Sequence, residues 1–258
     1  RSNAHLDLKF TYPSWGAYLD FINEVIIEAN VQPSQINMLD IVYFAPEIQG
    51  MDNLFRLQGR VKGPIRNLKG ENLKLSFGAS TSFKGNLQMT GLPNIYETFI
   101  KLKVQDFSTD LRDLQSFNLP NGEKLSSIPQ EIEKLGDIRI KGRFTGFYND
   151  FVSKIDLYSG MGFLATDLQF TNNKEENIVY YKGDFSGRNF QLGQFIDLES
   201  DFGKINFDFK LRGKGLNIAT VESKVTGRVD SLNFRGNELQ TIFIDAFVKE
   251  NQFEGAFH

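Results

Sequence analysis

The chain has 258 residues, of which 40% are apolar and 24% charged, a balance typical of one large or two small globular domains. Its formal net charge of −3 argues against a nucleic-acid partner, since a phosphate binder favours a basic surface. It has no cysteine, and its two histidines are His5 and His258, so disulfides, thiolate metal sites and serine or cysteine catalysis with an internal histidine base are excluded. We therefore expect no cofactor, no metal and no enzymatic activity.

Helical signals are few and occur at two places. Residues 1–4, RSNA, resemble the remnant of a cleaved purification tag and are left out of the interpretation of the fold. Apolar residues at spacings of three and four predict a short helix near 14–24. A second helix is predicted near 128–135, with Ser127 as N-cap and Gly136 at its end.

Strand-period alternation dominates the rest of the chain. In segments 82–92, 100–106, 202–216 and 221–230, apolar and polar residues alternate with a period of two. One apolar and one wet side is typical of antiparallel strands with a solvated face. The sequence therefore predicts an all-β protein, an elongated and curled antiparallel sheet that forms a groove.

Glycine punctuates these strands at roughly regular intervals. The pair Gly-Arg occurs at 59–60, 142–143, 187–188 and 227–228, which indicates a loose repeat of about 40 residues. A glycine inside a strand usually marks a bulge or a sharp bend, so these positions would let the sheet curl. Ordinary turn glycines in a β-sandwich remain the alternative.

The apolar side of these strands is the candidate functional site. It would line a trough that accepts acyl chains or unfolded apolar strands, unless it is simply the packed core of a sandwich. We expect this trough to be lined by Phe83, Leu87, Ile140, Phe144, Phe185, Ile205, Phe207, Phe209, Val225, Val229 and Phe234. The alternating basic residues, among them Lys101, Lys103, Lys141, Arg143 and Lys210, are predicted to solvate the outer face.

Carboxylates near turns are the remaining candidates for chemistry. Asp106 and Asp110 form one such pair, and Asp197, Glu199 and Asp201 form a second group. None has the spacing of a calcium loop, and we interpret both groups as solvated loop charges.

The succession of these motifs resembles the TamB family of the AsmA-like superfamily, in its Bacteroidota form. The resemblance is carried by YFAPEIQGMDNLFRLQGRVKGPIRNLKGENLKLSFG (43–78) and LGDIRIKGRFTGFYNDFVSKIDLYSGMGFLATDLQF (135–170). It continues in YKGDFSGRNFQLGQFI (181–196) and GKGLNIATVESKVTGRVDSLNFRGNEL (213–239). No membrane helix and no C-terminal family domain is present, so the chain looks like an interior piece.

The resemblance implies a long β-groove, often called a β-taco, in a periplasmic segment of an inner-membrane-anchored envelope protein. Such proteins are implicated in phospholipid transport to the outer membrane and in outer-membrane biogenesis with an Omp85-family partner. Residues 5–258 would then be one repeated groove segment, divisible at 125/126. The alternatives are a scaffold for assembly or secretion of outer-membrane β-barrel proteins, and a filled β-sandwich that acts as an adhesin or carbohydrate-binding module.

Overall fold

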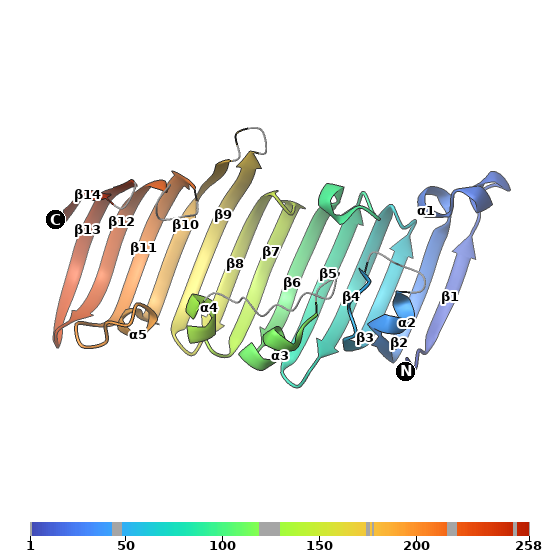
Figure 1. Cartoon of the computed structure of the whole chain (residues 1–258), viewed down its shortest axis with the longest axis horizontal. Helices are drawn as coiled ribbons and strands as arrows, with labels where there is room; N and C mark the ends of the chain where they lie inside the picture. The colour runs from blue at the N-terminus through green and yellow to red at the C-terminus, as the bar shows by residue number, and fades with distance from the viewer. Residues whose placement is uncertain are drawn as a thin grey trace. The chain divides into compact units, whose positions relative to one another are not determined.

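The computed structural model describes residues 2–42, 48–118, 130–173, 176, 178–215, 221–249 and 252–257. Its strands form one 14-stranded sheet in which each strand is hydrogen-bonded to the next along the chain (Figure 1). Each pairing between described strands for which the register is given is antiparallel. The prediction of an all-β, curled antiparallel sheet is confirmed, and this order differs from the two facing sheets of a sandwich.

The chain divides into two compact units, which are described separately. The N-terminal unit comprises Arg1–Glu133 and Asp137–Arg143, and the C-terminal unit comprises Lys134–Gly136 and Phe144–His258. The first unit holds β1 (Leu6–Thr11), β2 (Ile26–Asn37), β3 (Leu54–Gly63), β4 (Asn67–Phe77), β5 (Thr81–Thr90), β6 (Phe99–Thr109) and the start of β7 (Ile138–Phe147). The second holds the end of β7, β8 (Asp150–Ser159), β9 (Gly162–Asn173), β10 (Ile178–Gln191), β11 (Phe202–Lys214), β12 (Glu222–Phe234), β13 (Asn237–Lys249) and β14 (Gln252–Phe257).

Short helices occupy several connections between strands. The 3₁₀ helix η1 (Gly16–Leu19) and α1 (Phe21–Glu24) lie within the predicted helix near 14–24. Helix α4 (Gln130–Lys134) lies within the second predicted helix, whose proposed N-cap, Ser127, is outside the described residues.

Within the described residues, four further helical turns contradict the prediction that these stretches are strand or turn. They are α2 (Met38–Ile41), η3 (Ile95–Glu97), α3 (Leu111–Ser116) and α5 (Leu192–Phe195). Each spans at most six residues, which is too short for a helical period to show in the sequence. Capping contacts stabilise three of them, for example the Asp110 carboxylate that accepts from Asp113 N.

The strand register separates the side chains into two faces. Directly paired residues share a face, so Phe185 opposite Phe209 and Leu211 opposite Val225 lie on one side. Asp184 opposite Lys210 lies on the other. We call these sides the apolar face and the polar face, and the predicted alternation is confirmed.

One cluster of buried rings lies at a sheet edge beside α2 and α3. In the N-terminal unit, the Phe117 ring that follows α3 lies 5.5 Å from Phe77 and 6.3 Å from Phe55, and both partners are only 7% exposed. Figure 1 shows α2 and α3 at this same edge of the unit. These rings exclude water from the ends of β3 and β4. A second buried group lies at the opposite ends of the strands and comprises Ala17, Val25 and Thr98.

Candidate functional site

The apolar face carries the residues that the sequence singled out for the trough. In the C-terminal unit, β7 contributes Phe144 and β10 contributes Phe185. The remaining predicted residues of this unit lie on β11 (Ile205, Phe207, Phe209) and on β12 (Val225, Val229, Phe234). In the N-terminal unit, β5 contributes Phe83 and Leu87, and β7 contributes Ile140. The predicted lining residues are therefore described as two groups, one on each unit.

The group on the C-terminal unit is brought together by strand pairing. Phe185 on β10 is paired with Phe209 on β11, and the rings of Phe207 and Phe209 stack with centroids 4.7 Å apart. Phe207 is in turn paired with Val229 on β12. Val225 extends the face toward the far edge, opposite Leu211.

Aromatic contacts continue this face on β11 and β12 and on the neighbouring strands β7, β8 and β9. Phe234 packs on Phe202, with ring centroids 5.2 Å apart. At the other side of the unit, Phe144 packs on Phe151 at 4.8 Å, and Phe151 stacks on Phe170 at 4.9 Å. The result is a continuous band of aromatic and aliphatic side chains that crosses strand after strand.

Burial along this band is graded. Phe190, Ile205 and Val229 are buried, with 5%, 7% and 3% exposed. Phe185, Phe207 and Phe209 are half-buried, because no second sheet covers them in the described part of the C-terminal unit. Their exposure distinguishes this face from a filled core, in which such rings would be fully buried.

Glycines that the sequence analysis treated as bend markers also belong to this face. The Phe207 ring on β11 lies directly over Gly187 on β10, and a Cβ added to Gly187 would overlap it. At Gly227 an added Cβ would overlap the backbone oxygen of Asp208 first, and it would lie 3.0 Å from the Phe209 ring atom Cδ1. These rings lie down against the sheet instead of standing upright, which lowers the profile of the face. The sequence contains a signal for this arrangement, because these glycines occur at the apolar positions of the period-two alternation, as in Leu57, Gly59 and Val61.

The bend role of the glycines is also supported by register shifts. The pairing of β3 with β4 shifts between Gln58 and Arg60, and Gly59 between them has φ of 147°, a value that favours glycine. The pairing of β10 with β11 shifts between Gly187 and Phe190. Extra residues of this kind increase strand twist and bend, and so curve a sheet.

The polar face is held by ion pairs between neighbouring strands. Arg188 Nη2 lies 2.8 and 2.9 Å from the two carboxylate oxygens of Asp208. Glu222 accepts from Lys214 at 3.2 Å, and this hydrogen bond lowers the pKa of Glu222. A hollow of about 640 Å³ lies on this polar side of β8–β12, where short side chains such as Ala165 and Ser186 stand between long charged ones.

The carboxylates near turns have structural partners. Asp106 accepts from Arg139 Nε at 2.6 Å, and this hydrogen bond lowers the pKa of Asp106. Asp197 pairs with Lys134 at 2.6 Å, and Asp201 pairs with Arg235 at 2.7 Å. These carboxylates serve the loops and strand ends on which they lie.

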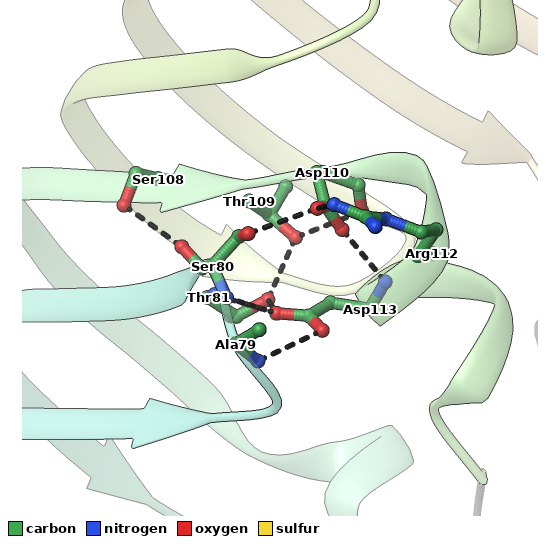
Figure 2. A network of polar contacts seen from close by, with 8 residues as sticks. All are labelled: Ala79, Ser80, Thr81, Ser108, Thr109, Asp110, Arg112 and Asp113. Atoms are coloured by element: carbon green, nitrogen blue, oxygen red, sulfur yellow. Dashed lines mark hydrogen bonds and ion pairs between the residues drawn. The ribbon is translucent and has the colours of Figure 1, made fainter.

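Asp110 and Asp113 form the most connected polar network (Figure 2). The Asp113 carboxylate accepts from the backbone N–H groups of Ala79, Ser80 and Thr81 and from the Thr81 hydroxyl. Burial raises the pKa of Asp113, but these hydrogen bonds together outweigh it and hold the pKa below the usual value for Asp. The network ties α3 to the β4–β5 turn. It thereby fixes Phe117, which follows α3, against Phe55 and Phe77.

Comparison with known proteins finds no protein family, no curated protein and no solved structure that matches this chain. Within the ranges that the structure describes, no helix is long and apolar enough to cross a membrane. Over the same ranges, no group of three or more histidine, aspartate or glutamate side chains is arranged to hold a metal ion.

Proposed function

We propose that the chain is a non-catalytic, periplasmic segment of a TamB/AsmA-like envelope protein, and that its apolar face shields lipid acyl chains during transport between the two membranes. The observation that carries the proposal is the half-buried band of Phe185, Phe207 and Phe209. This band is continuous from strand to strand and has no covering sheet in the described part of its unit.

The physical chemistry of this face suits an acyl chain. Each methylene removed from water contributes about 0.8 kcal/mol, so a band made mainly of aromatic and aliphatic side chains lowers the free energy of a lipid tail in an aqueous compartment. The Thr166 hydroxyl, on the residue paired with Phe185, is a buried polar group on this part of the face. Similar contacts repeat on successive strands, which favours movement along the band over binding at one tight site. The segment would be part of an inner-membrane-anchored protein and would work with an Omp85-family partner through other parts of that protein.

Site-specific photo-crosslinking tests this proposal. A photoreactive side chain replaces Phe185 or Phe207 on the apolar face, and Lys210, on the polar face of the same strand as Phe207, is the matched control. We expect lipid adducts from both phenylalanine positions and none from Lys210. Protein adducts alone would favour the β-barrel assembly scaffold, and no adducts at either phenylalanine would refute the lipid role.

A charge substitution adds a functional readout. Phe207→Asp places an unpaired carboxylate on the apolar face, whose desolvation is unfavourable, whereas Lys210→Asp changes the polar face alone. With the reporter at Phe185, we expect lipid adducts to fall at least about tenfold in the first variant and to persist in the second. Circular dichroism of both variants would establish that the sheet is intact.

A further inference from the structure

The polar face of the N-terminal unit is strongly basic from β3 to β7, although the whole chain has a net charge of −3. The register of β3–β6, and the period-two alternation of β7, place two carboxylates on this part of the face, Glu71 and Asp106. The basic side chains there, which we call the basic face, are Arg56, Arg60, Lys62, Lys69, Lys74, Lys84, Lys101, Lys103, Arg139, Lys141 and Arg143.

Most of this charge is not neutralised within the described part of the chain. Lys62 pairs with Glu28 on β2 at 2.8 Å, and Arg139 pairs with Asp106 at 2.6 Å. The other members of the basic face form no ion pair with another described residue. Like charges on adjacent strands repel one another, so the arrangement is unfavourable until an anion covers it.

The polar face of the C-terminal unit is a contrast within the same chain. There the basic side chains alternate with carboxylates and pair across strands, as Arg188 does with Asp208 and Lys224 does with Asp245. The polar face of that unit is therefore solvated by positive and negative side chains together, without an excess of positive charge. The excess on β3–β7 needs a separate explanation.

A hollow on the basic face shows where an anionic group fits. Its volume is about 440 Å³, and its lining includes Arg56, Lys74 and Lys84 together with the hydroxyls of Ser76 and Ser82. Three cations and the Ser76 hydroxyl suit the non-bridging oxygens of a phosphate group, while the Ser82 hydroxyl is hydrogen-bonded to Ser108. Among the residues that the structure describes, no carboxylate lines this hollow.

The remaining side chains of the basic face indicate what kind of anion it meets. Between Leu54 and Arg143, its described strands present one aromatic side chain on this side, Phe99, and Lys101 lies over that ring at 5.9 Å. Single-stranded nucleic acids need several stacking rings, and a stable protein interface needs an apolar centre. Lysines, which act as mobile point charges, outnumber arginines here, and the five strands span about 20 Å. This is the pattern expected for an extended array of phosphates.

We propose that the basic face docks the N-terminal unit onto the anionic surface of a lipid bilayer, with lipid phosphates in the hollow between Arg56, Lys74 and Lys84. The proposal goes beyond the acyl-chain role, because it uses the opposite side of the sheet and a different unit. Binding is electrostatic, so it depends on anionic lipid and weakens when salt screens the charges.

Vesicle sedimentation with the whole chain tests this docking. Vesicles of phosphatidylcholine alone are compared with vesicles that contain about one third phosphatidylglycerol, at low and at high salt. We expect binding to the anionic vesicles at low salt, at least about tenfold weaker binding at high salt, and little binding to the neutral ones. Equal binding to both vesicle types would overturn the proposal.

Charge-reversal variants then locate the surface. The test variant combines Arg56→Glu, Lys74→Glu and Lys84→Glu, and the control combines Lys182→Glu, Lys204→Glu and Arg212→Glu on the polar face of the C-terminal unit. The control residues are also exposed and form no ion pair with a described residue. Each variant reverses three positive charges, so both change the net charge equally.

We expect the test variant to lose at least about tenfold in vesicle binding and the control to lose less than about threefold. Equal losses in the two variants would show that net charge alone matters and would refute the assignment to this face. Retention on double-stranded DNA or heparin without vesicle binding would identify a soluble polyanion and refute the membrane. The acyl-chain role is measured separately, by lipid adducts from the photoreactive residue at position 185, so failure of one proposal is distinguishable from failure of the other.

Discussion

The Asp113 network allows a quantitative prediction of how much the contact between α3 and the β4–β5 turn stabilises the fold. The change is Asp113→Asn, which preserves the shape of the side chain and removes its charge. Asp113 is 6% exposed, and its carboxylate lies 2.7 Å from both Ser80 N and Thr81 N, 2.9 Å from the Thr81 hydroxyl and 3.1 Å from Ala79 N. Three of these donors share Oδ2, so an amide with its oxygen in that place turns its NH₂ group toward Ala79 N alone.

The expected cost follows from which donors water can reach. The amide oxygen can take the place of Oδ2 and keep Ser80 N, Thr81 N and the Thr81 hydroxyl, while Ala79, which faced Oδ1, is exposed and can donate to water. The bonds that remain lose the charge of their acceptor, and those from Thr81 are buried, since Thr81 is 8% exposed. A buried donor that loses a charged acceptor costs about 1–3 kcal/mol. We therefore expect Asp113→Asn to lower the free energy of unfolding by about 2 kcal/mol at neutral pH.

The pH dependence gives an independent check with a definite sign. The pKa of Asp113 in the folded chain lies below its usual value, so the stabilisation is complete above the unfolded pKa of about 4 and is lost as the pH falls through the folded pKa. Asparagine does not titrate. The stability difference between the two proteins should therefore be constant from pH 7 to about pH 5 and shrink below about pH 4.

Urea unfolding, followed by circular dichroism at neutral pH and below about pH 4, measures this stability difference. Amide exchange of residues 79–81 reports local opening of the β4–β5 turn. Asp245→Asn is the control, because the Asp245 side chain is 62% exposed and pairs with Lys224 on the surface, so little change is expected. A loss below about 0.5 kcal/mol for Asp113→Asn, or a difference that does not shrink in acid, would refute the reasoning.

Two further substitutions test the packing of the apolar face. Gly187→Val should lower the free energy of unfolding by about 1–3 kcal/mol, because its Cβ overlaps the Phe207 ring; Ser186→Val on the polar face is the control, and equal losses in urea unfolding would contradict the ring placement. Phe190→Ala should cost about 3–5 kcal/mol, since Phe190 is 5% exposed and packs on Phe195 at 5.2 Å. The half-buried Phe185→Ala should cost clearly less, and a larger loss there would mean that the band is covered.

Local pattern was sufficient for the strands and for the side on which their residues lie. Phe207 and Lys210 were assigned to opposite faces from alternation, and the register confirms this. Gly59 was assigned to a bend, and a register shift occurs there. Both features depend on the period-two geometry of a strand, which a sequence displays directly.

Features that depend on neighbours in space were not predictable in the same way. Helices α3 and α5 are single turns without a period of their own, and they form where strand ends leave apolar rings to cover. Asp110 was interpreted as a solvated loop charge, although it is 7% exposed and caps α3. Its role requires the β4–β5 turn, which lies about 30 residues earlier in the chain.

The sequence by itself determined that this protein is an antiparallel sheet with one apolar and one polar face, because alternation is a property of each strand alone. The tertiary structure decided which strands are neighbours, and hence which side chains add together. Strand pairing joins Phe185, Phe207 and Phe209 into one half-buried band, and it gathers Arg56, Lys74 and Lys84 around one hollow. Burial and charge density are sums over neighbours, so they exist only once the strands have paired.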